Sequence, residues 1–68
     1  MSIVKVIEVI AEGKTIEEAV QSALREASHT ISDIKQIDVE HIYAKVENNR
    51  ITGYRINADI SFVIHHNK

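Results

Sequence analysis

The chain has 68 residues, of which 44% are hydrophobic and 26% charged, and its formal net charge is −2. These values predict one soluble globular domain, residues 1–68, with a core near the lower size limit for independent folding. The slight negative charge and the lack of a Lys/Arg cluster argue against a nucleic-acid partner, and no apolar run reaches the ~18 residues of a membrane span. The absence of cysteine excludes disulfides, thiolate metal sites and thiol nucleophiles, and it favours a cytoplasmic location.

The first predicted element is a strand over residues 2–11, SIVKVIEVIA. Val and Ile occupy both alternating sets of positions, and only Lys5 and Glu8 interrupt them. Such a run predicts a strand that is covered on much of both faces. Gly13 then ends it.

A helix is predicted over residues 15–31, TIEEAVQSALREASHTI. Thr15 and Glu18 have the spacing of a capping box, in which each side chain accepts a hydrogen bond from a free backbone N–H at the helix start. Apolar residues recur at three- and four-residue spacing and form one stripe. Many of them are alanines, so the helix can lie close to a sheet.

A hairpin follows, with strands at about 35–46 and 54–64. In the first strand of this hairpin, the apolar residues change from odd-numbered positions (Ile37, Val39) to even-numbered positions (Ile42, Ala44). A β-bulge near Glu40 and His41 adds one residue and returns both sets to the same face.

A three-residue loop at 48–50 sets the register of this hairpin. It places Ile42 opposite Ile56 and Ala44 opposite Tyr54. Beyond the bulge, Val39 lies opposite Ala58 and Ile37 opposite Ile60. Every apolar residue of the hairpin then faces the helix.

The order strand, helix, strand, strand predicts an α+β fold. We expect a three-stranded antiparallel-type sheet, with the last strand in the centre and the helix packed on one face. A helix of ~17 residues spans ~25 Å, whereas a strand of ~14 residues spans ~46 Å. The hairpin therefore outruns the helix and the second sheet face is uncovered, so we expect a homo-oligomer in which the hairpin wraps neighbouring copies.

The uncovered face of the hairpin is polar, and two interpretations of it are open. It is either a solvated sheet face or a binding and interface surface. Asp38 lies opposite Asp59, and like charges in this position are destabilising unless positive charge is present. Lys5, Arg55 or a bound cation could supply that charge. The predicted residues of this face are Gln36, Asp38, Tyr43, Lys45, Gly53, Arg55, Asn57, Asp59 and Ser61.

Four segments together resemble the dodecin family: IVKVIEVIA (3–11), TIEEAVQSALREASHTI (15–31), IDVEHI (37–42) and YRINADISFVI (54–64). The resemblance covers almost the whole chain. It implies a hollow assembly of twelve subunits with tetrahedral symmetry that binds and stores small ligands, and many dodecins bind flavins. The partner of the chain is then the chain itself, together with a small-molecule or ion ligand.

The resemblance also implies where a flavin such as FMN or riboflavin would bind. The family's stacking tryptophan falls on Gln36, and its flavin-bonding glutamine falls on Arg55. Lys45 and Tyr43 are the other candidate residues of this site. Because the chain has no tryptophan, and a stacking face is worth roughly 1–3 kcal/mol by analogy with base stacking, we expect weak flavin binding.

Some dodecins lack the tryptophan and are called calcium dodecins, and the strand from Tyr54 resembles theirs. For calcium or magnesium the candidate ligands are Asp38 and Asp59, joined by Glu40, with symmetry completing the oxygen shell. The alternative is that these carboxylates pair with Lys5, Lys45 or Arg55.

No residue pattern points to catalysis. The serines lack a nucleophile context, and His29 and His41 have no third ligand at a metal spacing. We therefore expect a binding or storage protein or a purely structural assembly, and no enzyme.

Overall fold

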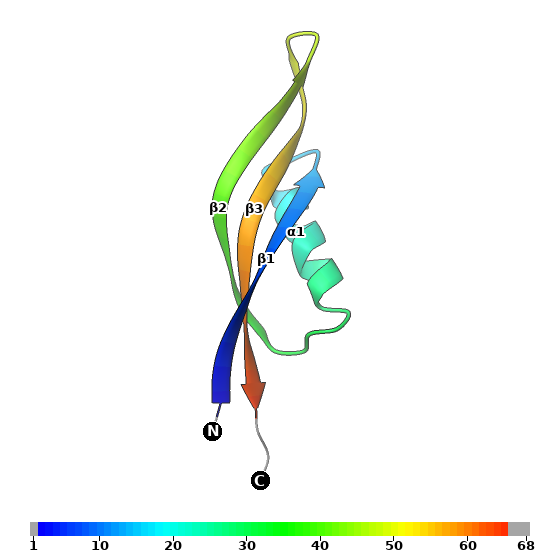
Figure 1. Ribbon diagram of the computed structural model, residues 1–68. Helices are drawn as coiled ribbons and strands as arrows, with labels where there is room; N and C mark the ends of the chain where they lie inside the picture. The colour runs from blue at the N-terminus through cyan, green and yellow to red at the C-terminus, as the bar shows by residue number, and fades with distance from the viewer. Residues whose placement is uncertain (1, 66–68) are drawn as a thin grey trace.

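The computed structural model, which describes residues 2–65, has four elements in the predicted order. They are β1 (Ser2–Gly13), α1 (Ile16–Ala27), β2 (Ile34–Glu47) and β3 (Arg50–His65). The sheet order is β1-β3-β2, and β3 runs antiparallel to both neighbours (Figure 1). The predicted α+β fold with a central last strand is confirmed.

The helix is shorter than predicted, because it ends at Ala27 and the segment 28–31 forms a turn. Ser28 donates its hydroxyl to the carbonyl of Arg25 at 2.9 Å, and the N–H groups of Thr30 and Ile31 both bond the carbonyl of Ala27. Ser and Thr compete for backbone partners in this way, which favours helix ends over helix interiors. At the other end, Thr15 accepts the N–H of Glu18 as predicted, while the Glu18 carboxylate bonds the N–H of Lys14.

The hairpin register is confirmed, although its turn differs from the prediction. The pairs Ile42–Ile56, Ala44–Tyr54, Val39–Ala58 and Ile37–Ile60 all occur, and the bulge lies between Val39 and His41. The loop, however, has two residues, Asn48 and Asn49, whose φ angles of 51° and 62° suit a tight hairpin turn. An additional irregularity at Thr52 restores the register that a three-residue loop would have given.

The core lies between α1 and the centre of the sheet. Ala19, Ala23 and Ala27 pack there against the fully buried Ile56 and Ile60 of β3. The small alanine side chains bring the helix close to the sheet, as their spacing predicted. Half-buried residues from the outer strands complete the core: Ile7, Val9, Ala11, Ile37 and Val39.

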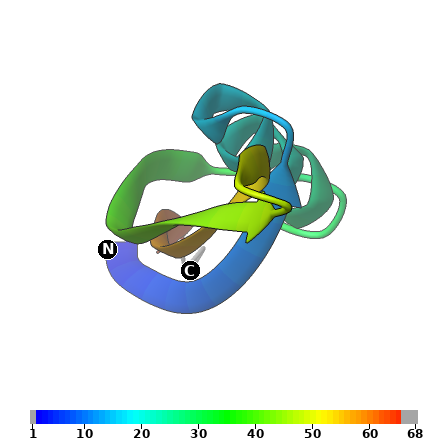
Figure 2. The ribbon, with the colours of Figure 1, turned by 90° about the horizontal axis from the view of Figure 1, so that it is seen from above.

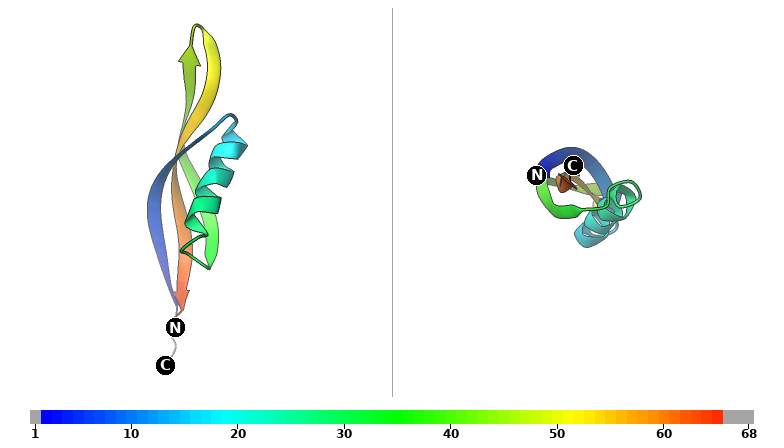
Figure 3. Two further views of the ribbon diagram at one scale, coloured as in Figure 1. Left: turned by 90° about the vertical axis from the view of Figure 1, so that its right-hand side faces the viewer. Right: turned by 90° about the horizontal axis from the view of Figure 1, so that it is seen from below.

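Much apolar surface remains outside this core. The prediction that the first strand is covered on both faces is wrong for the single chain, since Val4, Val6 and Ile10 are 57–66% exposed. Ile42 and Val46 lie beyond α1 and are 52% and 60% exposed, so the hairpin's apolar row extends past its helix. Figure 3 shows the hairpin projecting beyond the start of α1. Figure 2 shows the strong twist of the strands, with α1 to one side of them.

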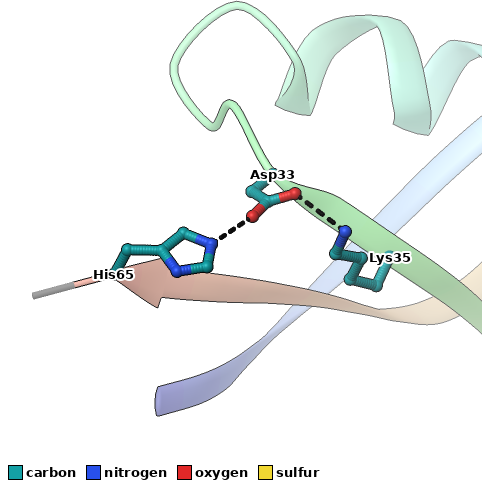
Figure 4. A network of polar contacts seen from close by, with 3 residues as sticks. All are labelled: Asp33, Lys35 and His65. Carbon is teal, nitrogen blue, oxygen red and sulfur yellow. Dashed lines mark hydrogen bonds and ion pairs between the residues drawn. The ribbon is translucent and has the colours of Figure 1, made fainter. Parts of the chain in front are cut away.

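An ion network ties the end of β3 to the segment before β2 (Figure 4). One carboxylate oxygen of Asp33 lies 2.7 Å from Nε2 of His65, and the other lies 3.1 Å from Nζ of Lys35. The hydrogen bond with His65, followed by that with Lys35, lowers the pKa of Asp33. The carbonyl of Asp33 also accepts the N–H of Val63. His65 is the last residue of β3 and pairs with Ser2 of β1.

Gly13 provides a test of the close contact between β1 and the start of α1. A Cβ at Gly13 would lie 2.6 Å from the backbone nitrogen of Ala19, whereas one at Gly53 would meet the carbonyl oxygen of Gly13 at 3.2 Å. Gly13→Ala should therefore lower the free energy of unfolding by about 1–3 kcal/mol, and Gly53→Ala should lower it less. Urea denaturation at one protein concentration measures both, and equal stabilities for Gly13→Ala and the unmodified chain would contradict the packing described.

Candidate functional site

The sheet face opposite α1, which we call the bare face, carries the candidate site. The side chains of a strand alternate between faces, so the register places the nine predicted β2 and β3 residues on this face. The β1–β3 register adds a third row that the sequence analysis did not include: Val4, Val6, Glu8, Ile10 and Glu12. The bare face is therefore part polar and part apolar.

Three carboxylates converge near the middle of the bare face. Asp38 pairs directly with Asp59 as predicted, and the bulge brings Glu40 beside them. One oxygen from each of the three carboxylates lies within 4.8 Å of the others. We call Asp38, Glu40 and Asp59 the acidic cluster. The structure thus brings the predicted cation ligands together.

Glu8 adds a fourth carboxylate beside the acidic cluster, because it pairs with Asp59 across the β1–β3 boundary. Glu8 could not be identified from the sequence. The apolar residues of β1 occupy both sets of alternating positions, so their pattern does not indicate its register against β3. A hollow of about 330 Å³ lies beside this position, between Glu8, Ile10 and Asn57.

The acidic cluster has no ion-pair partner within residues 2–65. The three ion pairs of this part of the chain are Lys35–Asp33, Lys45–Glu12 and His65–Asp33. Lys45 lies 3.3 Å from Glu12, and the guanidinium of Arg55 lies 5.2 Å from the ring centre of Tyr43. Lys5 pairs with Phe62 and so points to the helix side of the sheet. Within residues 2–65, neither these lysines nor Arg55 forms an ion pair with the cluster.

The electrostatics of the cluster favour added positive charge. The hydrogen bond with Asp38, followed by the negative charges of Asp38 and Asp59, raises the pKa of Glu40. A raised pKa means that the ionised group is destabilised by its neighbours. A proton or a metal cation would relieve this repulsion.

A second part of the bare face is basic and aromatic. His41 and Tyr43 have ring centres 6.3 Å apart, and Arg55 stacks on Tyr43 with Lys45 next to it along β2. These groups lie toward the hairpin turn, with Glu12 of β1 beside Arg55 and Lys45. Three of them, Tyr43, Lys45 and Arg55, are predicted ligand residues.

Gln36, the fourth predicted ligand residue, lies elsewhere. It pairs with Ser61, whereas Arg55 pairs with Tyr43, and the six residues from 55 to 61 span about 20 Å of strand. A flavin ring is shorter than this distance. The two positions that correspond to the family's flavin contacts therefore cannot hold one ring within a single chain.

The comparisons with known proteins agree with this fold. The family model for Dodecin matches residues 3–65, and no curated protein matches. A Thermus thermophilus dodecin point mutant is similar at a TM-score of 0.88 and 19% identity, over 97% of this chain and 100% of that chain. A Streptomyces coelicolor dodecin has a TM-score of 0.87 and 18% identity, over 97% of this chain and 96% of that chain. A Streptomyces davaonensis dodecin has a TM-score of 0.86 and 12% identity, over 96% of this chain and 97% of that chain.

The four-element fold is that of a small α+β protein with one sheet face uncovered. The chain belongs to the dodecin family. The family and fold support a small oligomeric protein that binds a ligand, and family members are binding or storage proteins. Within residues 2–65, α1 is too short to cross a membrane.

The raised pKa of Glu40 predicts how stability should vary with pH. A carboxyl whose pKa is raised in the folded state stabilises the fold at low pH, and that contribution is lost as pH rises through the raised value. In buffer with a metal chelator, Glu40→Gln should therefore lose less stability than the unmodified chain as pH rises from below 4.5 to neutral. Thermal melting across this range measures the difference.

Glu47→Gln is the matched control, because Glu47 is an exposed glutamate on β2 outside the acidic cluster. It should follow the pH dependence of the unmodified chain. Identical pH profiles for Glu40→Gln and Glu47→Gln would show that the cluster does not repel itself in solution.

Proposed function

We propose that this protein is a homododecameric binding and storage protein whose bare face holds a divalent cation, calcium or magnesium. The observation that carries the proposal is the convergence of Asp38, Glu40 and Asp59, whose ligand oxygens lie within 4.8 Å of one another. No basic side chain within residues 2–65 forms an ion pair with them. Like charges held this close need a positive counterpart.

Oxygen ligands of this kind suit hard cations. Calcium takes six to eight oxygens, and magnesium takes six, several of which are usually water. Three carboxylates supply part of such a shell. Glu8 lies next to the cluster, and water or a symmetry-related copy can supply the remainder. A symmetry-related copy could complete the oxygen shell of the cation if the bare faces are buried between copies.

The twelve-subunit assembly is supported by the family and by the surface of the single chain. Val4, Val6 and Ile10 expose 57–66% of their surface on the bare face. Burying these large apolar side chains between copies would be favourable. Burial between copies removes this surface from solvent and brings the acidic cluster into an interface.

Flavin is the second candidate ligand, favoured by family membership and by the aromatic ring of Tyr43, over which Arg55 lies. A ring bound there would meet Gln36 only from a second copy, since the two positions are about 20 Å apart in one chain. Gln36 offers no stacking face. The cationic Arg55 costs desolvation where a neutral ring would lie, so flavin binding should be weak.

Calcium binding should stabilise the protein. Millimolar calcium or magnesium is expected to raise the melting temperature, because a ligand at 100 times its dissociation constant adds about 2.7 kcal/mol of stability. Asp38→Asn and Asp59→Asn should each abolish the increase, whereas Glu47→Gln should retain it. A melting curve that does not change in calcium or magnesium would contradict the proposed cation site.

The flavin alternative is tested by restoring the family's residues. The unmodified chain should bind riboflavin or FMN weakly, and the double change Gln36→Trp with Arg55→Gln should create binding, measured by quenching of flavin fluorescence. Indole supplies a stacking face, and Gln supplies both a donor and an acceptor. Each single change should give much less.

Binding of flavin by the unmodified chain at micromolar affinity or better would show that Gln36 and Arg55 do not weaken the site. No gain in the double variant would show that other residues shape the pocket.

A further inference from the structure

Two basic side chains, those of Lys45 and Arg55, lie on the same sheet face as the acidic cluster. Lys45 belongs to the hairpin tip, residues 42–53, and Arg55 follows this tip along β3. They are neighbours on the face, because Arg55 pairs with Tyr43 and Lys45 is the next residue of β2 on that side. Ammonium and guanidinium groups are the side chains with which proteins bind phosphate. A pair of them without a counter-charge would attract anionic ligands.

Glu12 of β1 is a neighbour of both basic residues. It pairs with Arg55 across the β1–β3 boundary, and its Oε1 lies 3.3 Å from Nζ of Lys45. This ion pair joins two strands that are not adjacent, because β3 separates β1 from β2. Lys45 can reach across β3 since its partner there is Gly53, which has no side chain.

The backbone holds Glu12 in this position. The next residue, Gly13, pairs with Tyr54 and ends β1. A Cβ at Gly13 would lie 2.6 Å from the backbone nitrogen of Ala19, so the end of β1 packs directly against the start of α1. The Glu12 carboxylate therefore projects from a strand end that cannot shift without moving the helix.

The ion pair contributes little to stability, because the side chains of Glu12 and Lys45 are 53% and 52% exposed. Its charge matters instead for what approaches this face. Arg55 lies with its guanidinium 5.2 Å from the ring centre of Tyr43 on one side and has Glu12 as its strand partner on the other. An incoming anion would therefore meet the negative charge of Glu12 beside each basic group.

We propose that Glu12 determines the charge selectivity of the bare face. Its carboxylate offsets the charge of Lys45 and repels anions from Arg55, so the face accepts cations and rejects phosphate-bearing ligands. Selectivity commonly depends on repulsion of the wrong ligand as well as on attraction of the right one. This inference rests on the proposed cation-binding function and names the residue that excludes the opposite class of ligand.

Glu12 is separate from the proposed cation ligands. The acidic cluster does not include it, and the four residues from Arg55 to Asp59 span about 13 Å of strand. Removal of the charge of Glu12 should therefore change anion binding and leave calcium binding in place.

The variant Glu12→Gln tests the proposal, because glutamine keeps the size of the side chain and removes its charge. Inorganic pyrophosphate is the probe, and isothermal titration calorimetry in metal-depleted buffer of low ionic strength is the measurement. Glu12→Gln should bind pyrophosphate at least ten-fold more tightly than the unmodified protein. The double variant Glu12→Gln with Lys45→Gln should lose this gain.

Glu17→Gln is the matched control. It removes the same charge from the first turn of α1, which packs on the other face of the sheet. It should bind pyrophosphate as weakly as the unmodified protein. Equal affinities of the unmodified protein and Glu12→Gln would overturn the proposal, and so would a gain that Glu17→Gln shares.

Melting curves of the same proteins with and without calcium separate this proposal from the proposed cation site. Glu12→Gln should keep the rise in melting temperature that calcium gives the unmodified protein. Loss of that rise in Glu12→Gln alone would make Glu12 part of the cation site and overturn its role in selectivity. No rise in any of the proteins, with the pyrophosphate gain intact, would contradict the cation site and leave the exclusion of anions by Glu12 standing.

Discussion

One short helix cannot cover a long three-stranded sheet, and the rest of the structure follows from this constraint. The 12 residues of α1 span about 18 Å, while the 16 residues of β3 span about 53 Å. The helix therefore buries only the centre of one sheet face, around Ile56 and Ile60. The hairpin tip and the whole bare face are left for other copies of the chain and for a ligand.

The β-bulge in β2 connects this fold to its candidate site. In a regular strand without the bulge, Val39 and Ile42 would point to opposite faces of the sheet. The bulge keeps Ile37 and Ile42 on the core side, and it also adds a third carboxylate to the pair formed by Asp38 and Asp59. One backbone irregularity thus completes the core and concentrates negative charge on the other face.

Much of the fold could be predicted from the sequence because the hairpin pattern allowed only one register. The change of phase between Val39 and Ile42 required a bulge, and alternation then determined the pairing with β3. Two features could not be predicted in this way. The two-residue turn at Asn48 and its compensating irregularity at Thr52 give the same pairing as a longer loop, and the apolar stripe of α1 continues through Ile31 although the helix ends at Ala27.

Only those residues of the candidate site that lie in the hairpin could be predicted from the sequence. Asp38 and Asp59 were found by register, but Glu8 was missed because both sets of alternating positions in β1 are apolar. The predicted flavin residues Gln36 and Arg55 are not adjacent in the chain, since they pair with Ser61 and Tyr43. Sequence pattern identifies residues that share a face, but their spacing along it depends on strand register.

If the uncovered sheet surfaces are buried between copies, native mass spectrometry at micromolar protein concentration should detect a single particle. Its mass should be roughly 90 kDa, twelve times the 7.7 kDa of one chain. A monomer or dimer under these conditions would contradict this expectation, because the exposed Val4, Ile10 and Ile51 would then have no partner to cover them.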